Sequence, residues 1–67
     1  MDLEEKYPIL EFFSYGHLPS HLREVSECFH DLAEEMAVKL LESDEVREGL
    51  RKLLEAKDCF VRAAIPK

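Results

Sequence analysis

The chain has 67 residues and a formal net charge of −6, and it is 46% hydrophobic and 36% charged. This length allows one domain with a marginal core, because a chain of about 60 residues buries only about 60% of its unfolded surface. Its nine Lys and Arg residues are spread along an acidic sequence, which excludes the clustered basic surface that binds duplex nucleic acid. No apolar run reaches the ~18 residues of a membrane span.

Residues 1–16 are predicted to form an arm. The segment ILEFFSYG is rich in aliphatic and aromatic side chains, and Gly16 interrupts it. The pattern fits either a short helical turn or an extended segment. We expect Phe12, Phe13 and Tyr15 to fold back over part of the helices that follow.

The spacing predicts a first long helix over residues 19–41. Pro19 suits the first turn, where a missing N–H costs nothing. Apolar side chains then recur at helical spacing with no breaker. They are Leu18, Leu22, Val25, Phe29, Leu32, Met36 and Leu40, joined by Ala33 and Ala37.

A turn is predicted at ESDE, residues 42–45, followed by a second helix over residues 44–65. Ser43 or Asp44 is the expected N-cap. A second apolar stripe then begins at Val46, and Pro66 ends the helix. Gly49 interrupts the stripe at a cost of about 1 kcal/mol relative to Ala, and we expect it to allow the close approach of another helix.

These elements predict an all-α fold: one domain, residues 1–67, with two long antiparallel helices preceded by the arm. The two stripes exceed what a single helical hairpin can cover. We therefore expect the chain to associate, most simply with copies of itself into a homo-oligomer.

Cysteines and histidines give no sign of a metal site. Cys28 and Cys59 fall at similar levels of a hairpin, and a disulfide between them is conceivable. We interpret them instead as small buried apolar residues with reduced thiols, since the start MDLEEKYPIL lacks the order of a signal peptide and a cytosolic location is expected. His17 is interpreted as a capping or ligand-contacting group and His21 as solvated.

No catalytic constellation is found, so we expect a protein that is not an enzyme and needs no cofactor or metal. Glu34 and Glu35 are adjacent and diverge on a helix. The arm is more informative, because Tyr15 directly precedes a helix start and Arg23 lies one turn inside it. Aromatic rings stack on bases, and helix starts and guanidinium groups hold phosphates. The same rings also fit a simpler role as a plug for the hairpin.

Two segments resemble a known family. FFSYGHLPSHLREVSECFHDLA, residues 12–33, and SDEVREGLRKLLEAKDCFVRAAI, residues 43–65, are similar to the helical hairpin domain of phage anti-CBASS and anti-Thoeris sponge proteins. The motif aromatic–x–Tyr–x–His–Leu–Pro spans Phe13 to Pro19, and the run LRKLLEAKD starts at Leu50. The resemblance covers about two thirds of the chain.

The resemblance implies a hexamer of hairpins that binds cyclic di- or trinucleotides, or cyclic ADP-ribose isomers, without cleaving them. It places Tyr15 as the ring that stacks on a base. Helix starts in this family often read Glu-Arg-Thr, where this chain has Val46 at the Arg position; Arg47 is the expected substitute. The full set of candidate ligand-binding residues is Tyr15, Phe13, His17, Arg23, Ser26, His30 and Arg47.

The expected function is therefore sequestration of a bacterial immune signal in the cytoplasm of the bacterial host, at pockets between subunits. The expected partners are copies of the chain and the nucleotide, with no duplex nucleic acid and no membrane. The alternative is a small helical adaptor between proteins, or a phage structural or assembly protein, with no nucleotide ligand.

Overall fold

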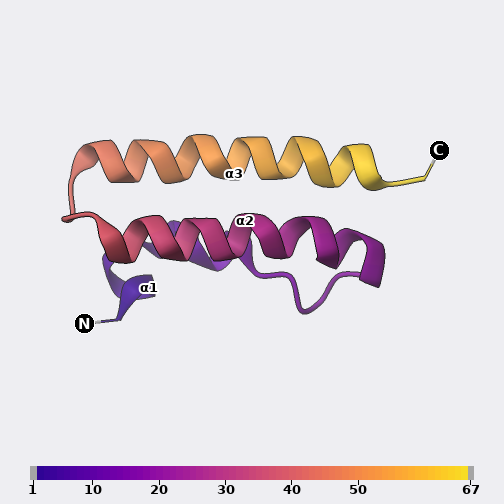
Figure 1. Cartoon of the computed structure of the whole chain (residues 1–67), viewed down its shortest axis with the longest axis horizontal. Helices are drawn as coiled ribbons and strands as arrows, with labels where there is room; N and C mark the ends of the chain where they lie inside the picture. Colours follow the sequence, from indigo (N-terminus) through magenta and orange to yellow (C-terminus); the bar gives the residue numbers. More distant parts are fainter. Residues whose placement is uncertain (1, 67) are drawn as a thin grey trace.

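A computed structural model describes residues 2–66, and its regular elements are all helical. A short helix α1 (Leu3–Lys6) and a 3-10 helix η1 (Pro8–Phe13) precede two long helices, α2 (Ser20–Lys39) and α3 (Asp44–Ala64). In Figure 1, α2 and α3 lie side by side and run in opposite directions, and the arm lies against them behind α2. The all-α prediction is confirmed. Met1 and Lys67, which the predicted domain includes, lie outside the described residues.

The arm is helical over most of its length. The Asp2 side chain accepts a hydrogen bond from the Glu5 N–H at 3.1 Å and so caps α1. Pro8 then opens η1, where its fixed φ suits a first helical position. Of the two conformations that the sequence left open, the structure has the helical turn.

The long helices begin and end close to the predicted residues. Pro19 is the N-cap of α2, and the helix ends at Lys39, two residues early, because Leu40 is extended. Ser43 caps α3 as predicted and accepts a hydrogen bond from the Val46 N–H at 3.2 Å. Ile65 is already extended at the end of α3, because a following proline disfavours the α conformation.

Small side chains of α2 let the arm approach closely. The core consists of Tyr7, Leu10 and Phe13 from the arm, Ala33 and Ala37 from α2, and Leu50 from α3. The large side chains that the periodicity marked as the core of the first helix are only partly covered, and Leu32 is 43% exposed. That expectation is wrong for a single chain, because the arm covers the side of α2 that carries Ala33 and Ala37.

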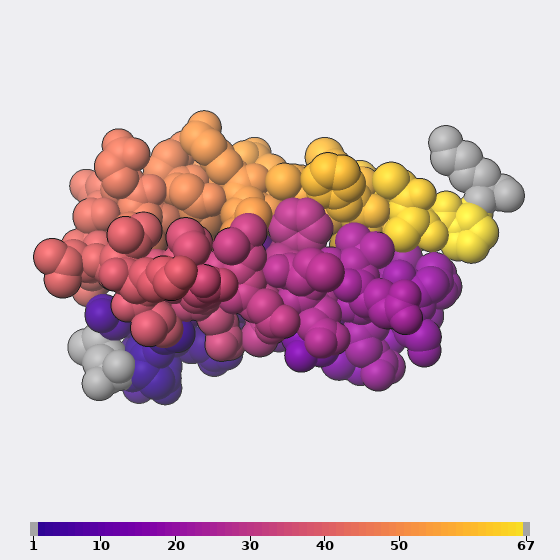
Figure 2. Space-filling view, in the orientation of Figure 1, coloured from indigo at the N-terminus to yellow at the C-terminus, as the bar shows by residue number. Residues whose placement is uncertain are grey.

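The remaining large side chains form an uncovered apolar surface, which we call the open face. It comprises Val25, Phe29, Leu32, Met36 and Leu40 of α2 with Val46, Gly49, Leu53 and Phe60 of α3. Figure 2 looks onto the side of α2 and α3 where the arm shows only at the lower edge. A groove of about 370 Å³ runs between the helices there, lined from Leu32 to Leu40 and from Glu45 to Leu53.

The structure bears on two expectations about single residues: the one for the cysteines is wrong, and the one for Gly49 is not met within a single chain. Cys28 and Cys59 are free and exposed, not buried. Phe29 and Phe60 stack on each other at 5.7 Å, and the residue before each ring points about 100° away around the helix. Gly49 meets no heavy atom within 4 Å of a built Cβ, so no helix of this chain approaches it closely.

Lys57 attaches the arm to α3. Its Nζ donates to the Phe12 carbonyl at 2.7 Å and lies 5.9 Å from the centre of the Phe13 ring. Its side chain is only 12% exposed. A charged donor that is nearly covered makes one of the stronger hydrogen bonds of a protein.

We expect Lys57→Met to lower the free energy of unfolding by about 1.5–3 kcal/mol, the usual worth of a hydrogen bond to a charged group. Urea denaturation monitored by circular dichroism measures it. Lys52→Met is the matched control, because Lys52 is 68% exposed on the same helix. Equal effects of the two substitutions would contradict a role for Lys57 in holding the arm.

Candidate functional site

A tight turn, residues 15–18, joins the arm to α2. The Leu18 N–H donates to the Tyr15 carbonyl at 3.1 Å. Arg23 reaches back from α2 and donates from Nε and Nη2 to the Leu18 carbonyl, at 3.4 and 3.2 Å. The start of α2 has no side-chain cap, so the interpretation of His17 as a capping residue is wrong. Pro19 occupies the cap position and offers no side-chain hydrogen bond, while His17 is exposed on the turn.

Tyr15 lies against the side of α2. Its ring meets the His30 ring edge-on, with 5.1 Å between the centroids and an interplanar angle of 73°. Tyr15 and His30 are both partly exposed, so each retains a free edge. Ser26 lies one helical turn before His30 on the same face of α2, and it is fully buried. The structure thus brings Tyr15, Ser26 and His30 to one region.

The Ser26 hydroxyl is a buried polar group without a partner. Within the described residues, its Oγ and the Tyr7 hydroxyl are the buried side-chain oxygens that make no hydrogen bond. Buried polar atoms are nearly always bonded, so each exception calls for an explanation. A ligand or a water molecule at the arm would provide the Ser26 hydroxyl with a hydrogen-bond partner.

The charges around this region are mixed. His30 has its Nδ1 at 3.1 Å from Asp31 and its Nε2 at 3.0 Å from Glu34. Arg23 is exposed, and in the described part of the chain its guanidinium donates only to a backbone carbonyl. Arg23 is therefore the candidate residue best able to offer charge to an anion here. The two carboxylates beside His30 work against it.

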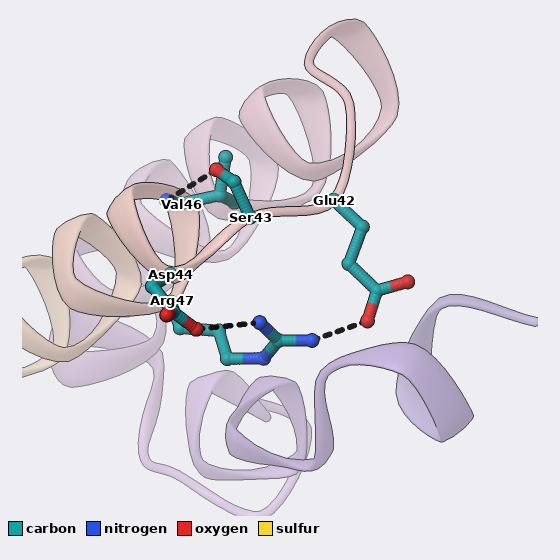
Figure 3. Close-up of polar contacts among 5 residues, drawn as sticks. All are labelled: Glu42, Ser43, Asp44, Val46 and Arg47. Atoms are coloured by element: carbon teal, nitrogen blue, oxygen red, sulfur yellow. Dashed lines mark hydrogen bonds and ion pairs between the residues drawn. The ribbon is translucent and has the colours of Figure 1, made fainter.

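Two predicted site residues lie elsewhere. The Phe13 ring is 0% exposed in the core, so no ligand reaches it in this conformation. Arg47 lies near the start of α3, beside the end of α2, and a helix of 20 residues spans about 30 Å. Tyr15 lies beside His30 in the middle of α2, whereas Arg47 lies beside the last turn of α2, so the two do not share one site in a single chain. Figure 3 shows Arg47 held between Asp44, at 3.1 Å, and Glu42.

Arg47 lines a crevice that the sequence did not reveal. Lys6, Tyr7, Pro8 and Ile9 of the arm meet Arg47 and Arg51 of α3 around a cavity of about 180 Å³. The Arg47 guanidinium carbon lies 5.8 Å from the centre of the Tyr7 ring. Carboxylates already bind both arginines, so the crevice offers little free positive charge. Only the folded position of the arm reveals it.

Arg51 and Glu48 form the strongest local pairing there. Arg51 donates two hydrogen bonds to Glu48 and lies 3.7 Å from Glu55. The bond from Arg51 holds the pKa of Glu48 below its usual value, with a smaller contribution from Lys52, while Glu48 raises the pKa of Arg51. Both groups face solvent, so salt screens their attraction.

The described residues contain no group of three or more His, Cys, Asp or Glu arranged to hold a metal ion. None of the helices in residues 2–66 combines the length and the apolar character needed to cross a bilayer. The side chains that gather near Tyr15 can stack on a flat ring, donate hydrogen bonds and attract one phosphate through Arg23. These are binding contacts.

Searches of family models, curated proteins and solved structures found nothing that matches this chain.

The Glu48 carboxyl should titrate below pH 4.5, its ordinary value, in a carbon-detected NMR titration. Because its pKa is lowered by folding, the stabilisation it gives is present above the unfolded pKa and is lost as pH falls through the folded pKa. Arg51→Gln should raise the Glu48 pKa more than Lys52→Gln does, since Arg51 is the larger cause. The reverse order would contradict the pairing.

Ser26→Ala should raise the free energy of unfolding by about 1 kcal/mol, because it removes a buried hydroxyl that has lost its water without gaining a partner. Thermal unfolding of the free protein measures the change. Ser20→Ala, at the exposed start of α2, is the control for a change of serine to alanine in this helix. A loss of stability specific to Ser26→Ala would mean that the hydroxyl is satisfied.

Proposed function

We propose that this chain is the subunit of a non-catalytic oligomer that binds and sequesters a cyclic oligonucleotide or a cyclic ADP-ribose-type signal. In this proposal the helical hairpin of α2 and α3 is the repeating unit, six copies assemble, and the ligand lies where subunits meet. The resemblance in sequence to phage sponge proteins suggests the ligand class. It also suggests the bacterial cytoplasm as the location and a role against host defence.

The observation that carries the proposal is the position of Tyr15. Its ring lies beside the middle of α2, partly exposed, against His30. The free edge of the Tyr15 ring can stack on a base, whereas the Ser26 hydroxyl one turn before His30 is fully buried and is not reached in this conformation. A phosphate attached to that base would find the Arg23 guanidinium, which lies two turns before His30 along α2.

Charge explains why the site belongs between subunits. The chain carries −6, and Asp31 and Glu34 lie beside His30, so one subunit alone repels an anion. Sequestration against a receptor requires a dissociation constant near 1 nM, about −12 kcal/mol. A second subunit has the same net charge, so what it would contribute is a local cation such as its own Arg23, together with a wall that encloses the ligand. Pre-assembled walls lower the ordering cost of binding.

A second candidate function has its own support. The groove of the open face is apolar apart from Glu45 at its edge, and it suits a helix better than a nucleotide. A small adaptor between proteins, or a phage structural or assembly protein, would use this face and leave the surroundings of Tyr15 unoccupied. Ligand titration separates the two functions.

Isothermal titration of the protein with a panel of cyclic di- and trinucleotides and cyclic ADP-ribose isomers is the test. We expect one or more to bind, and Tyr15→Ala to weaken that binding by about 1–3 kcal/mol through lost stacking. Tyr15→Phe should retain most of the affinity.

Phe12→Ala is the matched control, because Phe12 is the arm's other exposed ring, 59% exposed, and is not part of the proposed site. No heat and no thermal shift with the panel would leave the adaptor function ahead. Equal losses for Tyr15→Ala and Phe12→Ala would show that stacking on Tyr15 is not the contact.

A further inference from the structure

The folded chain exposes more surface and is more extended than a compact monomer of its size. The accessible surface is 4825 Å², against about 4,400 Å² expected for a compact monomer of 7.8 kDa. The radius of gyration is 12.3 Å, against about 11 Å for a compact chain of this length. The molecule is a slab with α2 and α3 side by side on one surface (Figure 2).

The side chains of the open face have the spacing of a helical interface. Within each helix they recur at alternating steps of three and four residues, which is the heptad pattern of helices that pack on other helices. The open-face positions in these rows are Val25, Phe29, Leu32 and Met36 in α2 and Val46, Gly49, Leu53 and Phe60 in α3. Leu22 and Ala56 complete the rows at the same spacing. A separate row at the same spacing, Ser26, His30, Ala33 and Ala37, lies on the side of α2 that the arm covers.

Gly49 indicates a close approach on this face. It lies in the middle of the groove lining, and a Cβ built on it meets nothing within 4 Å. A glycine inside a helix costs about 1 kcal/mol relative to Ala, and nothing within this chain offsets that cost. A helix packed across Gly49 would offset this cost, because the missing side chain lets the two helix backbones come close together.

We infer that the open face is the contact between two copies of this chain, related by a two-fold axis, with four long helices inside and both arms outside. The face is self-complementary: large side chains such as Leu32 and Phe60 share it with the small residues Gly49 and Ala56. A two-fold contact places the large side chains of each copy against the small residues of the other copy. One copy thus supplies the cover that the heptad spacing requires.

The size of the face agrees with a stable pair. The whole side of the molecule that carries the open face measures 40 Å by 19 Å, a projected area of about 760 Å², and a face with projecting side chains has more accessible area than its projection. A specific interface of standard size buries about 800 Å² on each partner. An isolated helix from another protein would cover only part of that width, because a helix with side chains is about 10–12 Å in diameter.

This inference says which surface forms the assembly of the proposed function. It does not depend on the proposed ligand, because no nucleotide enters the contact. The groove lining has no cation, so the residues that pair two copies and the residues near Tyr15 are separate sets. The pair is the smallest unit from which a larger assembly of even number can be built.

Sedimentation equilibrium of the full chain across 1–200 µM is the experiment. We expect a dimer or a larger even-numbered assembly, and Leu32→Asp to raise the dissociation constant at least tenfold, because it places a charge inside an apolar contact. Val38→Asp is the matched control: Val38 is 69% exposed on α2 but lies outside the open face, and it should leave association unchanged. A wild-type chain that stays a folded monomer, or equal effects of the two variants, would overturn the inference.

A second measurement needs no variant. If two copies pair in the native state, the thermal midpoint of the wild-type chain should rise with protein concentration. A midpoint that is constant over the same range would also overturn the inference. An assembly that binds nucleotide and that Leu32→Asp leaves intact would count against the pairing alone, whereas an assembly that Leu32→Asp disrupts and that binds no nucleotide would count against the proposed function alone.

Discussion

The structure depends on how apolar side chains are distributed around α2 and α3. One side of α2 carries small residues, Ala33 and Ala37, and the adjacent side carries large ones, among them Leu32 and Met36. The arm is a single layer and covers only the side with small residues, where Tyr7 and Phe13 become fully buried. No segment of residues 2–66 lies on the other side, so the large side chains there remain open. Polar contacts such as that of Lys57 with the Phe12 carbonyl fix the position of the arm, but they cannot cover the large apolar side chains on the other side.

The same arrangement separates the charged groups of the molecule into two regions. Antiparallel helices put the start of α2 and the start of α3 at opposite ends (Figure 1), so Arg23 and Arg47 do not lie near each other in one chain. Arg47 is bound by Glu42 and Asp44, whereas Arg23 contacts a backbone carbonyl. Any anion site in one subunit is therefore weak, and a strong one requires contributions from more than one subunit.

Much of the fold could be predicted from the sequence, because it depends on local signals. The Ser43 cap, the proline after Ile65 and the apolar spacing placed both long helices within two residues of their observed ends. The arm was harder to predict, since the burial of Tyr7 and the path of η1 depend on contacts with residues far along the chain. The exposed state of Cys28 and Cys59 was missed because each precedes a phenylalanine whose ring, rather than the thiol, turns toward the other helix.

The candidate site was predictable only in part, for a related reason. Tyr15, Ser26 and His30 share one side of the first half of α2 through short-range geometry, which helical spacing and a nearby turn can indicate. Phe13 precedes Tyr15 by two residues, but it points into the core because η1 ends there, and no local signal distinguishes the two rings.

The apolar character of the open face also limits which substitutions its positions can accept. A phosphate in that groove would lose its hydration without meeting a cation, which is costly, so the groove itself does not suit an anion. Val46 lines the groove, so a basic residue at that position would place a charge on the apolar surface, whereas valine keeps the surface apolar. Assembly through the open face does not require a ligand, whereas the proposed ligand site requires the assembly.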